Sequence, residues 1–434
     1  MLVRVCRTAS IAFVTAFVAA CGQGVEGVGV LPLADAGHAG SGDGSSGAGS
    51  FPPLDGGAPT GEDGASVSGS TAPCVGGATR CAGNGVEACG SNGQWSVAVA
   101  CASSTPACAE GACVEPPSCA VSAMGTTNCG ASSESCCASV VAPSGTYDRT
   151  YTSGAGGAAN LADPASVSGF RLDKYLVTVG RFRQFVNAIT ASAGLPPANG
   201  SGIHTHLNGG RGLANSGSPG SFETGWDAAN WDSEIPTGPS GSGVWDCNLT
   251  DCLSSSTWTN PAGTQENLPI TCVDWYEAYA FCIWDGGFLP SEAEWEYVAA
   301  GGSQQREYPW GSTGPGTGNE YAIYGCYYGD GDAGTPAGGC TGTSIAPVGT
   351  AVLGAGYWGQ LDLAGEVFEW NIDWYAPYVD PCTDCAYLSS TTVRVIRGGN
   401  YGGVLLNLQA ENRDFFEDPT DHDSVIGFRC ARSP

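Results

Sequence analysis

The stretch LPSEAEWE, residues 289–296, decides how this chain folds. Ser291 is followed three residues later by Glu294, which is the spacing of a capping box at a helix N-terminus. Trp295 begins a set of apolar residues at helical spacing, and a glycine pair that starts at Gly301 supplies a stop. The stretch therefore predicts a short helix that begins after Ser291 and ends before Gly301.

Two further helices are predicted by the same kind of signal. Asp274 followed by Glu277 is a second capping box, and a glycine pair at residues 286–287 ends that helix. Thr178 can cap a third helix, whose apolar residues recur at helical spacing: Val179, Phe182, Val186 and Ile189. Short strand-like runs such as residues 393–396 (VRVI) lie between long loops rich in Gly, Asn and Pro. These patterns predict an α+β fold with high loop content.

The N-terminal segment has the pattern of an export signal. Arg4 and Arg7 precede an apolar run at residues 11–20, which is half of the roughly 20 residues that a membrane-spanning helix needs. The sequence VAAC at its end resembles the lipobox of bacterial lipoproteins, so Cys21 is expected to become a lipid-modified N-terminus; an ordinary cleaved signal with a chance cysteine is the alternative. Because Gly22 and not an acidic residue follows, we expect an exported protein that is lipid-anchored to the cell envelope, in the outer membrane.

The chain divides into four segments by composition. After the signal at residues 1–21, residues 22–72 are mostly Gly, Ala, Ser and Asp and bury too little apolar surface to fold, so we expect a flexible, disordered stalk. Residues 73–139 hold ten cysteines, as small disulfide-stapled modules do, and we interpret them as a stiff spacer in preference to a ligand-binding module. Eleven of the twelve tryptophans lie beyond residue 150, so residues 140–434 are expected to form one large domain.

The charge balance limits the classes of partner. The formal net charge is −27, and only 15 of the 434 residues are Lys or Arg. Binding to nucleic acid requires clustered basic residues that neutralise phosphates, so we expect no nucleic-acid partner. An acidic surface suits small cations better.

Six segments, in this order along the chain, resemble the formylglycine-generating enzyme family, also called the sulfatase-modifying factor family. They are FRLDKYLVTVGRFRQF (170–185), LPSEAEWE (289–296), YPWG (308–311), DLAGEVFEW (362–370), RVIRGGNY (394–401) and GFRC (427–430). Each motif alone is weak, but the ordered set covers nearly all of residues 140–434. The resemblance implies a loop-rich variant of the C-type lectin-like fold, which agrees with the α+β prediction made from the residues themselves.

The resemblance also implies an activity, and the sequence departs from the family at the decisive positions. Enzymes of this family oxidise a cysteine of a sulfatase peptide to formylglycine, using molecular oxygen and a copper ion held by two cysteines. Counting from the Arg-Gly-Gly motif places these cysteines at Gly403 and Leu408, and neither residue can bind copper(I), which requires soft thiolate ligands. Asn400 also replaces a serine of the family, and Phe368 replaces a tryptophan beside the substrate cleft. Copper-dependent oxidation is therefore not expected.

A second branch of the family resembles iron-dependent sulfoxide synthases, which bind their metal through three histidines. The large domain has only His204, His206 and His422. The first two alternate along the chain and can share one face of a strand, but the sequence offers no third ligand near them. We interpret them as a solvated pair of loop residues and predict no iron site.

The cysteines of the large domain are expected to form disulfides, because exported proteins fold in an oxidising compartment. The resemblance implies one pair, Cys282 with Cys430, which would join a helix to the C-terminal strand. Proximity in the sequence suggests three more pairs: Cys247 with Cys252, Cys326 with Cys340, and Cys382 with Cys385. Cys272 is then left over and is interpreted as a buried, inert thiol.

A calcium loop is implied by the resemblance as well. Asp362, Gly365, Val367 and Glu369 match a family loop in which two side-chain oxygens join two backbone carbonyls, a ligand set that suits this hard cation. An acidic turn packed against the following tryptophan is the alternative. A second family calcium site does not transfer, because Ala322 stands where an asparagine is expected.

Together these observations predict a recognition domain on the cell surface. With the scaffold retained and the copper ligands replaced, we expect the family's cleft to bind a peptide, a glycan or a surface protein. The cleft walls implied by the resemblance are Trp275, Phe368, Arg397, Asn400, Tyr401 and Arg413. Their rings can stack and their guanidinium groups can hold carboxylates, whereas core packing or internal ion pairing is the alternative for each. The competing classes are an oxidoreductase that uses other thiols or a non-haem metal, and an architectural envelope protein.

Overall fold

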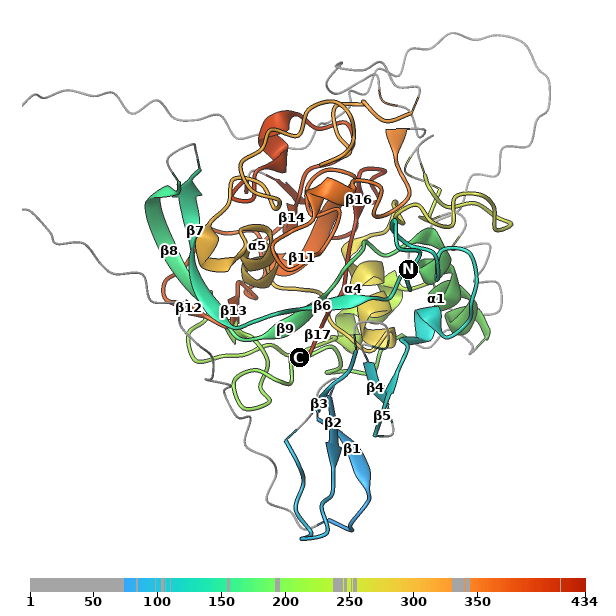
Figure 1. Ribbon diagram of the computed structural model, residues 1–434, viewed down its shortest axis with the longest axis vertical. Helices are drawn as coiled ribbons and strands as arrows, with labels where there is room; N and C mark the ends of the chain where they lie inside the picture. Colours follow the sequence, from blue (N-terminus) through green and yellow to red (C-terminus); the bar gives the residue numbers. More distant parts are fainter. Residues whose placement is uncertain are drawn as a thin grey trace, which may run out of the picture.

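The computed structural model describes residues 74–434, with gaps at 83–84, 98, 103–104, 106, 110, 154–156, 192–195, 237–244, 246–247, 251, 253–255, 330–339, 341–343 and 414. These residues form a mixed α/β structure with long loops (Figure 1). The predicted signal, the predicted lipidation at Cys21 and the predicted stalk at 22–72 lie outside the described residues. No described helix combines the length and the apolar character that crossing a bilayer requires.

A four-stranded sheet forms the centre of the large domain. Its strands, in order across the sheet, are β15 (Phe416–Glu417), β14 (Arg394–Arg397), β11 (Phe368–Trp374) and β16 (Ile426–Gly427). β11 pairs antiparallel with β14, which places Glu369 opposite Arg397, and it pairs parallel with β16. The predicted strand at 393–396 thus corresponds to β14, and the sheet brings three of the quoted motifs side by side.

Three smaller sheets surround this centre. They contain β12 (Cys382–Thr383), β8 (Ala159–Val167) and β7 (Gly145–Thr152); β17 (Ala431–Arg432), β9 (Phe170–Asp173) and β6 (Ser139–Ala142); and β10 (Ala214–Asn215) with β13 (Cys385–Ala386). β7 and β8 form a long hairpin at one side of the domain (Figure 1). β17 lies antiparallel to β9, so the C-terminal strand closes against the start of the domain.

The three helices predicted from the sequence are all present. Asp274 Oδ1 accepts a hydrogen bond from Glu277 N at 2.8 Å, and Ser291 Oγ accepts one from Glu294 N at 3.2 Å, so both capping boxes are confirmed. Thr178 caps the third helix by accepting from a backbone N–H of its first turn at 3.1 Å. The helices are α1 (Val179–Ala191), α2 (Ala228–Trp231), α4 (Trp275–Trp284) and α5 (Glu292–Ala299), with short 3-10 turns η1 (Pro117–Cys119), η2 (Asp232–Glu234), η4 (Gly302–Gln304), η6 (Val352–Gly354) and η7 (Leu405–Leu408).

Aromatic side chains fill the space between α1, α4 and the central sheet. Phe182 stacks on Phe281 with ring centroids 5.6 Å apart, and Trp245 meets Phe182 edge-on at 5.8 Å. Five tryptophans are fully buried: Trp226, Trp245, Trp275, Trp295 and Trp370. Such rings bury a large apolar area each, so this core supplies the main stabilisation of the domain.

Eight disulfides join described cysteines. The predicted pairs Cys282–Cys430, Cys326–Cys340 and Cys382–Cys385 are confirmed. Cys252 instead pairs with Cys272, so the predicted Cys247–Cys252 pair and the predicted free thiol at Cys272 are both wrong; Cys247 itself lies outside the described residues. Thr257 explains the pairing, because its hydroxyl accepts from Thr271 N at 3.1 Å and so holds the two segments side by side.

The predicted cysteine-rich module divides in two by its packing. Its first part forms short strands that project from the large domain (Figure 1): β1 (Thr79–Ala82), β2 (Gly85–Ala88), β3 (Val99–Ala100), β4 (Ala107–Ala109) and β5 (Ala112–Val114). Its second part holds the disulfides Cys119–Cys137 and Cys129–Cys136 in a buried cluster with Tyr175 of the large domain. This second part therefore shares the core of the large domain.

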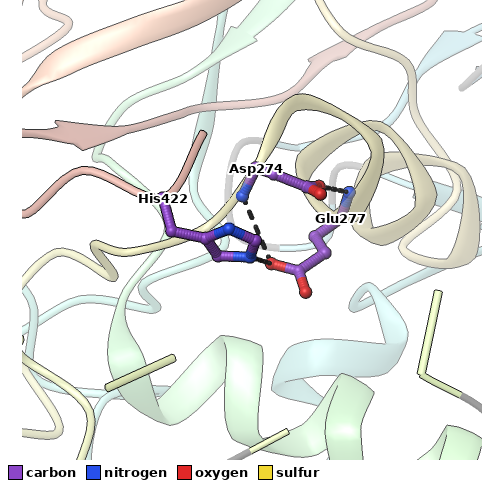
Figure 2. Close-up of side chains that lie close together, drawn as sticks. All are labelled: Asp274, Glu277 and His422. Carbon is purple, nitrogen blue, oxygen red and sulfur yellow. Dashed lines mark hydrogen bonds and ion pairs between the residues drawn. The ribbon is translucent and has the colours of Figure 1, made fainter. Parts of the chain in front are cut away.

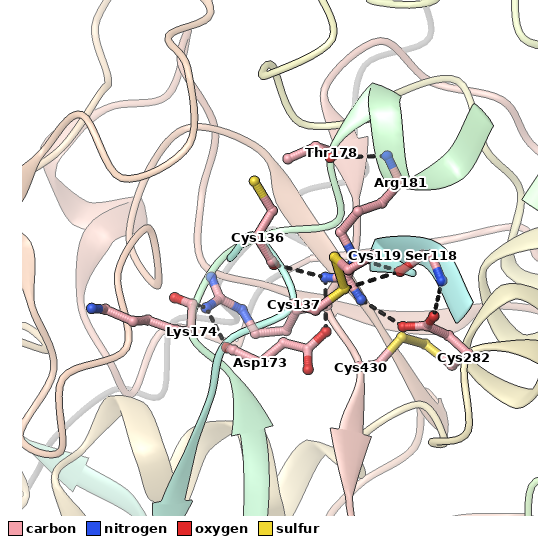
Figure 3. Close-up of polar contacts among 12 residues, drawn as sticks. Ser118, Cys119, Cys136, Cys137, Asp173, Lys174, Thr178, Arg181, Cys282 and Cys430 are labelled. Atoms are coloured by element: carbon pink, nitrogen blue, oxygen red, sulfur yellow. Dashed lines mark hydrogen bonds and ion pairs between the residues drawn. A yellow bond between two sulfur atoms is a disulfide. The ribbon is translucent and has the colours of Figure 1, made fainter. Parts of the chain in front are cut away.

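A network of buried charges ties the second part to the large domain (Figure 3). Arg181 of α1 donates to Asp173 at 3.0 Å and to Asp285 at 2.7 Å, and Arg432 donates to the same two carboxylates at 3.1 and 2.8 Å. Ser118 joins them, because its N–H donates to Asp285 at 2.9 Å and its hydroxyl accepts from Arg181 at 3.0 Å. Two positive and two negative side chains, all fully buried, compensate one another here.

Candidate functional site

The turn that carries the two copper-ligand positions follows β14. Gly403 N donates to Asn400 O at 2.9 Å, and the Asn400 side chain accepts from Gly402 N at 2.8 Å, so Asn400 closes the turn. Leu408 ends the turn η7, and its side chain is buried in a cluster with Tyr308. A hydrogen atom and a packed isobutyl group thus occupy the places of the two thiolates.

A disulfide lies against this turn. Cys326 N donates to Tyr401 O at 2.9 Å, and Cys326 is bonded to Cys340. A Cβ atom on Gly402 would come within 3.1 Å of Cys340 Sγ. Because these sulfur atoms are bonded to each other, neither is a thiolate ligand for copper(I).

Two arginines that were predicted to line the cleft are held inside the domain by α5. Arg397 Nη2 lies 3.0 Å from Glu296 Oε2, and Arg413 forms two hydrogen bonds with Glu292, at 2.7 and 3.0 Å. Burial would raise the pKa of Glu292, but Arg413 and Arg397 hold it below its usual value. The hollow beside Arg413 measures about 10 Å³, barely the room of one water. Both arginines are therefore internal ion-pair partners, as the alternative interpretation proposed.

The aromatic residues of the predicted cleft are buried as well. Phe368 packs against Phe415 with ring centroids 4.6 Å apart and the ring planes tilted by 43°. Tyr401 is 4 % exposed and belongs to the same cluster as the disulfides of the cysteine-rich segment. Trp275 is also buried, but unlike Phe368 and Tyr401 it borders a sizeable cavity.

The cavity beside Trp275 has a volume of about 140 Å³. Arg394 reaches into it from β14 between two indole rings, with its guanidinium carbon 3.6 Å from the ring centroid of Trp275 and 3.7 Å from that of Trp374. Trp275 is fixed in turn by a hydrogen bond from its Nε1 to Asn371 O at 2.8 Å. Arg394 and Arg397 are three residues apart in one strand, so their side chains point to opposite faces of the sheet.

The Arg394 side chain has no acidic partner among the described residues. Its Nη1 donates to Ile372 O at 2.6 Å, whereas its buried Nε has no acceptor there. Burial lowers the pKa of Arg394 to about 9, although Tyr276 acts against this, so the group is cationic at neutral pH. Sequence analysis missed this residue, because in the sequence Arg394 is only one member of a strand-like run.

The predicted calcium loop has pairings that the resemblance did not imply. Both carboxylate oxygens of Glu369 accept from Arg429, at 2.7 and 2.9 Å. Gly365 adopts a positive φ of 81°, and a Cβ there would lie 2.4 Å from a backbone oxygen, so the turn requires glycine. Val367 is buried in the core. Glu369 is thus an internal ion-pair partner.

Two other acids in this loop, Asp362 and Glu366, form no ion pair with any described residue, although Arg429 is near enough to lower the pKa of Asp362. Asp362 accepts from a backbone N–H at 2.6 Å, and burial raises its pKa to about 6. Glu366, which the sequence analysis did not single out, accepts one backbone bond at 2.7 Å, and its other oxygen is buried without a partner. Burial, and then the nearby Asp362, raise the pKa of Glu366 well above its usual value. This pair of carboxyls fits a hard cation better than Glu369 does.

The histidine pair at 204 and 206 is not solvated, so that interpretation was wrong. His204 is fully buried, with Nδ1 2.9 Å from Glu223 and Nε2 3.3 Å from Glu294. Burial alone would lower the pKa of His204, but the two carboxylates raise it to about 10. Burial and the charge of His204 lower the pKa of His206 to about 4. A buried imidazolium with two carboxylates explains the pair without a metal.

His422 lies elsewhere, at the start of α4 (Figure 2). Its Nε2 is 3.4 Å from Glu277 Oε2, and the same oxygen accepts from Asp274 N at 3.2 Å. In the part of the chain that the structure describes, these three residues are the one group of three side chains that could hold a metal ion. Because two of their oxygens already bond to the helix N-terminus, the capping of α4 accounts for the acidic pair.

Comparison with known proteins assigns the large domain. Residues 126–434 match the family model described as Sulfatase-modifying factor enzyme 1-like domain, or FGE-sulfatase. The chain belongs to the FGE-sulfatase family. The match begins inside the predicted cysteine-rich module, at the part that shares the core of the large domain.

Relatives of this FGE-sulfatase domain cover part of the chain. The formylglycine-generating enzyme of Mus musculus is 33% identical over 191 residues, which are 41% of this chain and 50% of the relative. A Mus musculus protein named Inactive C-alpha-formylglycine-generating enzyme 2 is 30% identical over 187 residues, covering 41% and 54%. The chain thus spans about half the length of these curated relatives. Among solved structures, PvdO from Pseudomonas aeruginosa matches with a TM-score of 0.41 at 20% identity, covering 68% of this chain and 94% of that one.

Proposed function

We propose that this FGE-sulfatase domain is a non-catalytic recognition domain of an exported, lipid-anchored envelope protein, and that its ligand is a peptide, a glycan or a surface protein. The observation that carries the proposal is the residue pair at the copper positions. Gly403 has no side chain and Leu408 is buried, whereas copper(I) requires soft thiolates. One relative is named as an inactive formylglycine-generating enzyme, which supports a role for this domain without that activity.

The proposal includes the loop-rich C-type lectin-like arrangement that the motifs imply. Mixed sheets with few, short helices and long connecting loops support it. Loops positioned by a rigid scaffold are where binding residues concentrate, so such an arrangement suits recognition.

Export and lipid attachment at Cys21 belong to the same proposal. The eight disulfides among described cysteines support an oxidising compartment. Metabolic labelling with an alkyne fatty acid should mark the wild-type protein and leave Cys21→Ala unlabelled and outside the membrane fraction. Equal labelling of both proteins would contradict the anchor.

We also propose a structural calcium ion, held by Asp362 and Glu366 together with the carbonyls of Gly365 and Val367. A cation at this position would compensate two buried carboxyls that form no ion pair among the described residues. We expect calcium at tenfold excess over its dissociation constant to raise the free energy of unfolding by about 1.4 kcal/mol relative to EDTA, and Glu366→Gln to abolish the effect. The same unfolding midpoint with and without EDTA would exclude the ion.

The decisive test of the main proposal is enzymatic. The mature protein is incubated with copper(I), oxygen and a cysteine-containing sulfatase peptide, and the peptide is followed by mass spectrometry beside a formylglycine-generating enzyme that has its cysteine pair. We expect conversion by the control enzyme only. Conversion of the cysteine by this protein would overturn the proposal in favour of the oxidoreductase. Peptide and glycan arrays form the second arm, and a repeated absence of binding would favour the architectural protein.

A further inference from the structure

The cavity beside Arg394 is enclosed mainly by aromatic and aliphatic side chains. Its lining includes Trp231, Trp275, Tyr279, Ile372, Trp374 and Leu388. Trp231 meets Trp275 edge-on at 5.5 Å, so the walls hold each other in place. A volume of about 140 Å³ has room for a small organic group. The cavity is therefore a preformed site with aromatic walls, polar lining residues that include Asn215 and Thr224, and a cation in its wall.

The acids close to this cation are bonded to other groups. Glu223 borders the cavity, but its carboxylate accepts from the backbone and the ring of His204, at 3.0 and 2.9 Å. Asp373, on the same strand as Trp374, accepts from two backbone N–H groups, both at 2.7 Å. Neither forms an ion pair with Arg394, whose Nε stays without an acceptor among the described residues. Among the described residues, Arg394 thus lacks the ion pair that the buried Arg181, Arg397, Arg429 and Arg432 form.

We propose that Arg394 binds the carboxylate of a ligand whose apolar body fills the space between the tryptophans, either a small monocarboxylate or the C-terminal residue of a peptide. The inference rests on the proposed recognition function and names the chemical group that is recognised. The single negative charge of a carboxylate matches the single cation, and a guanidinium group offers directed, charge-assisted donors to a carboxylate. The apolar body displaces water from the indole walls.

The lining disfavours two other anions. A sugar acid carries hydroxyl groups around its whole ring, and the indole and aliphatic side chains of the lining offer them few hydrogen-bond partners. A phosphate dianion would bring a second negative charge into a site with one cation. An apolar monocarboxylate has neither mismatch.

The test compares two ligands of one shape on the mature full-length chain. Phenylacetate and its neutral isostere phenylacetamide are titrated by isothermal titration calorimetry. We expect saturable binding of phenylacetate and at least about tenfold weaker binding of the amide, because the amide cannot form the charge-assisted pair. This comparison uses the wild-type protein, so it does not depend on how any variant folds.

Two matched substitutions locate the site. Arg394→Met keeps most of the apolar volume and removes the charge, so it should lose the preference for the acid over the amide. Arg80→Met is the control, because Arg80 also stacks on an indole, at 4.2 Å from Trp95, but in the projecting cysteine-rich strands. The control should bind phenylacetate as the wild type does.

A peptide arm distinguishes the two sources of the carboxylate. Gly-Gly-Phe with a free C-terminus is compared with its C-terminal amide; tighter binding of the free peptide than of phenylacetate supports a peptide terminus, and the reverse supports a small molecule. Equal binding of acid and amide, a preference retained by Arg394→Met, binding of glucuronate in place of the apolar acids, or no binding of any probe would each overturn the inference.

Failure of this inference is distinguishable from failure of the proposed function. Oxidation of the sulfatase peptide would overturn the non-catalytic function whatever the cavity binds. Array ligands that Arg394→Met still captures, together with no preference for phenylacetate over its amide, would leave the recognition function standing and remove the Arg394 cavity from it.

Discussion

Buried arginines have different partners in two regions of this molecule. Where α1, α4 and the C-terminal strand meet, Arg181 and Arg432 share the carboxylates of Asp173 and Asp285 at 2.7 to 3.1 Å. In the central sheet, Arg394 is also buried but lies between two indole rings, and its Nε has no acceptor among the residues that the structure describes. Burial alone therefore does not separate a structural charge from a binding one, whereas the set of partners does.

The difference has energetic consequences. Moving a charge out of water costs several kcal/mol, and a close counter-charge offsets that loss only when both partners stay in place. In the first region, the removal of one partner leaves the remaining charges buried without full compensation. In the second region, no described carboxylate forms an ion pair with Arg394, so removing the arginine leaves no buried carboxylate without its partner. Removing an arginine should therefore lower the free energy of unfolding more in the first region than in the second.

The largest effect is expected from the disulfide beside the first region. Cys282 lies in α4 one turn before Asp285, and Cys430 leads into the C-terminal strand, so the disulfide joins the same elements as the ion pairs. The two cysteines are 148 residues apart in the sequence, and the chain-entropy relation gives about 5 kcal/mol for a loop of this length. We expect Cys282→Ala with Cys430→Ala to lower the free energy of unfolding by about this amount in guanidinium titrations.

The matched control is the disulfide Cys382–Cys385, whose cysteines are three residues apart in the sequence. The same relation gives about 2 kcal/mol for its removal. Equal losses for the two pairs would mean that loop closure does not explain how the first disulfide stabilises the domain.

The next largest effect is expected from Arg181→Met. Methionine fills most of the volume but leaves Asp173 and Asp285 buried with one cation between them, so we expect a loss of about 4 kcal/mol in the free energy of unfolding. Arg80→Met, whose ion pair with Glu87 is partly exposed, should cost less than about 1 kcal/mol. Similar losses for the two variants in urea titrations would contradict the stabilising role of the buried network.

A smaller, pH-dependent effect is expected at His204, another buried cation. Its pKa is raised to about 10 by Glu223 and Glu294 against the effect of burial, so the stability it contributes is fully present below pH 6.5 and is lost as the pH rises through 10. Between pH 7 and pH 9 the unfolded chain is largely without this proton, whereas the folded chain still binds it. We therefore expect the wild-type free energy of unfolding to fall by about 2 kcal/mol more over this interval than that of His204→Gln.

His206→Gln is the control for this pH effect. The pKa of His206 is lowered to about 4, so its imidazole is neutral in both states above pH 7 and should not change the alkaline slope. If His204→Gln and the wild type lost stability in parallel from pH 7 to pH 9, His204 would not be a buried cation.

Local signals predicted much of the fold. The capping boxes at Asp274 and Ser291 were readable because a cap depends on residues three positions apart. The partner of Cys252 was not readable, since residues 256–258 and 269–271 come together through tertiary hydrogen bonds of Thr257 with Pro269 and Thr271. Pairing by proximity in the sequence fails when a tertiary contact brings a more distant cysteine closer.

The candidate site was harder to predict for a related reason. Helix α5 carries Glu292, Glu294 and Glu296, a composition typical of a solvent-facing helix, yet all three are buried. Each is paired with a cation from a distant segment, and two of these cations are Arg397 and Arg413, which the sequence placed at the cleft. Charge pairing depends on neighbours in three dimensions. The sequence could therefore identify the arginines, but it could not show which of them forms no ion pair with a described residue.

The smallest stability effect is expected where the binding proposal is strongest. Arg394→Met removes two contacts with indole rings and one hydrogen bond to a backbone oxygen, but it also removes the desolvation of an unpaired charge. These contributions oppose each other, so we expect the free energy of unfolding to change by about 1 kcal/mol or less, although Arg394 is as buried as Arg181. Adding phenylacetate should then stabilise the wild type and leave Arg394→Met unchanged, because a ligand stabilises only the state that binds it. A loss as large as that of Arg181→Met would show that Arg394 has a structural counter-charge after all, and the contrast between the two regions would disappear.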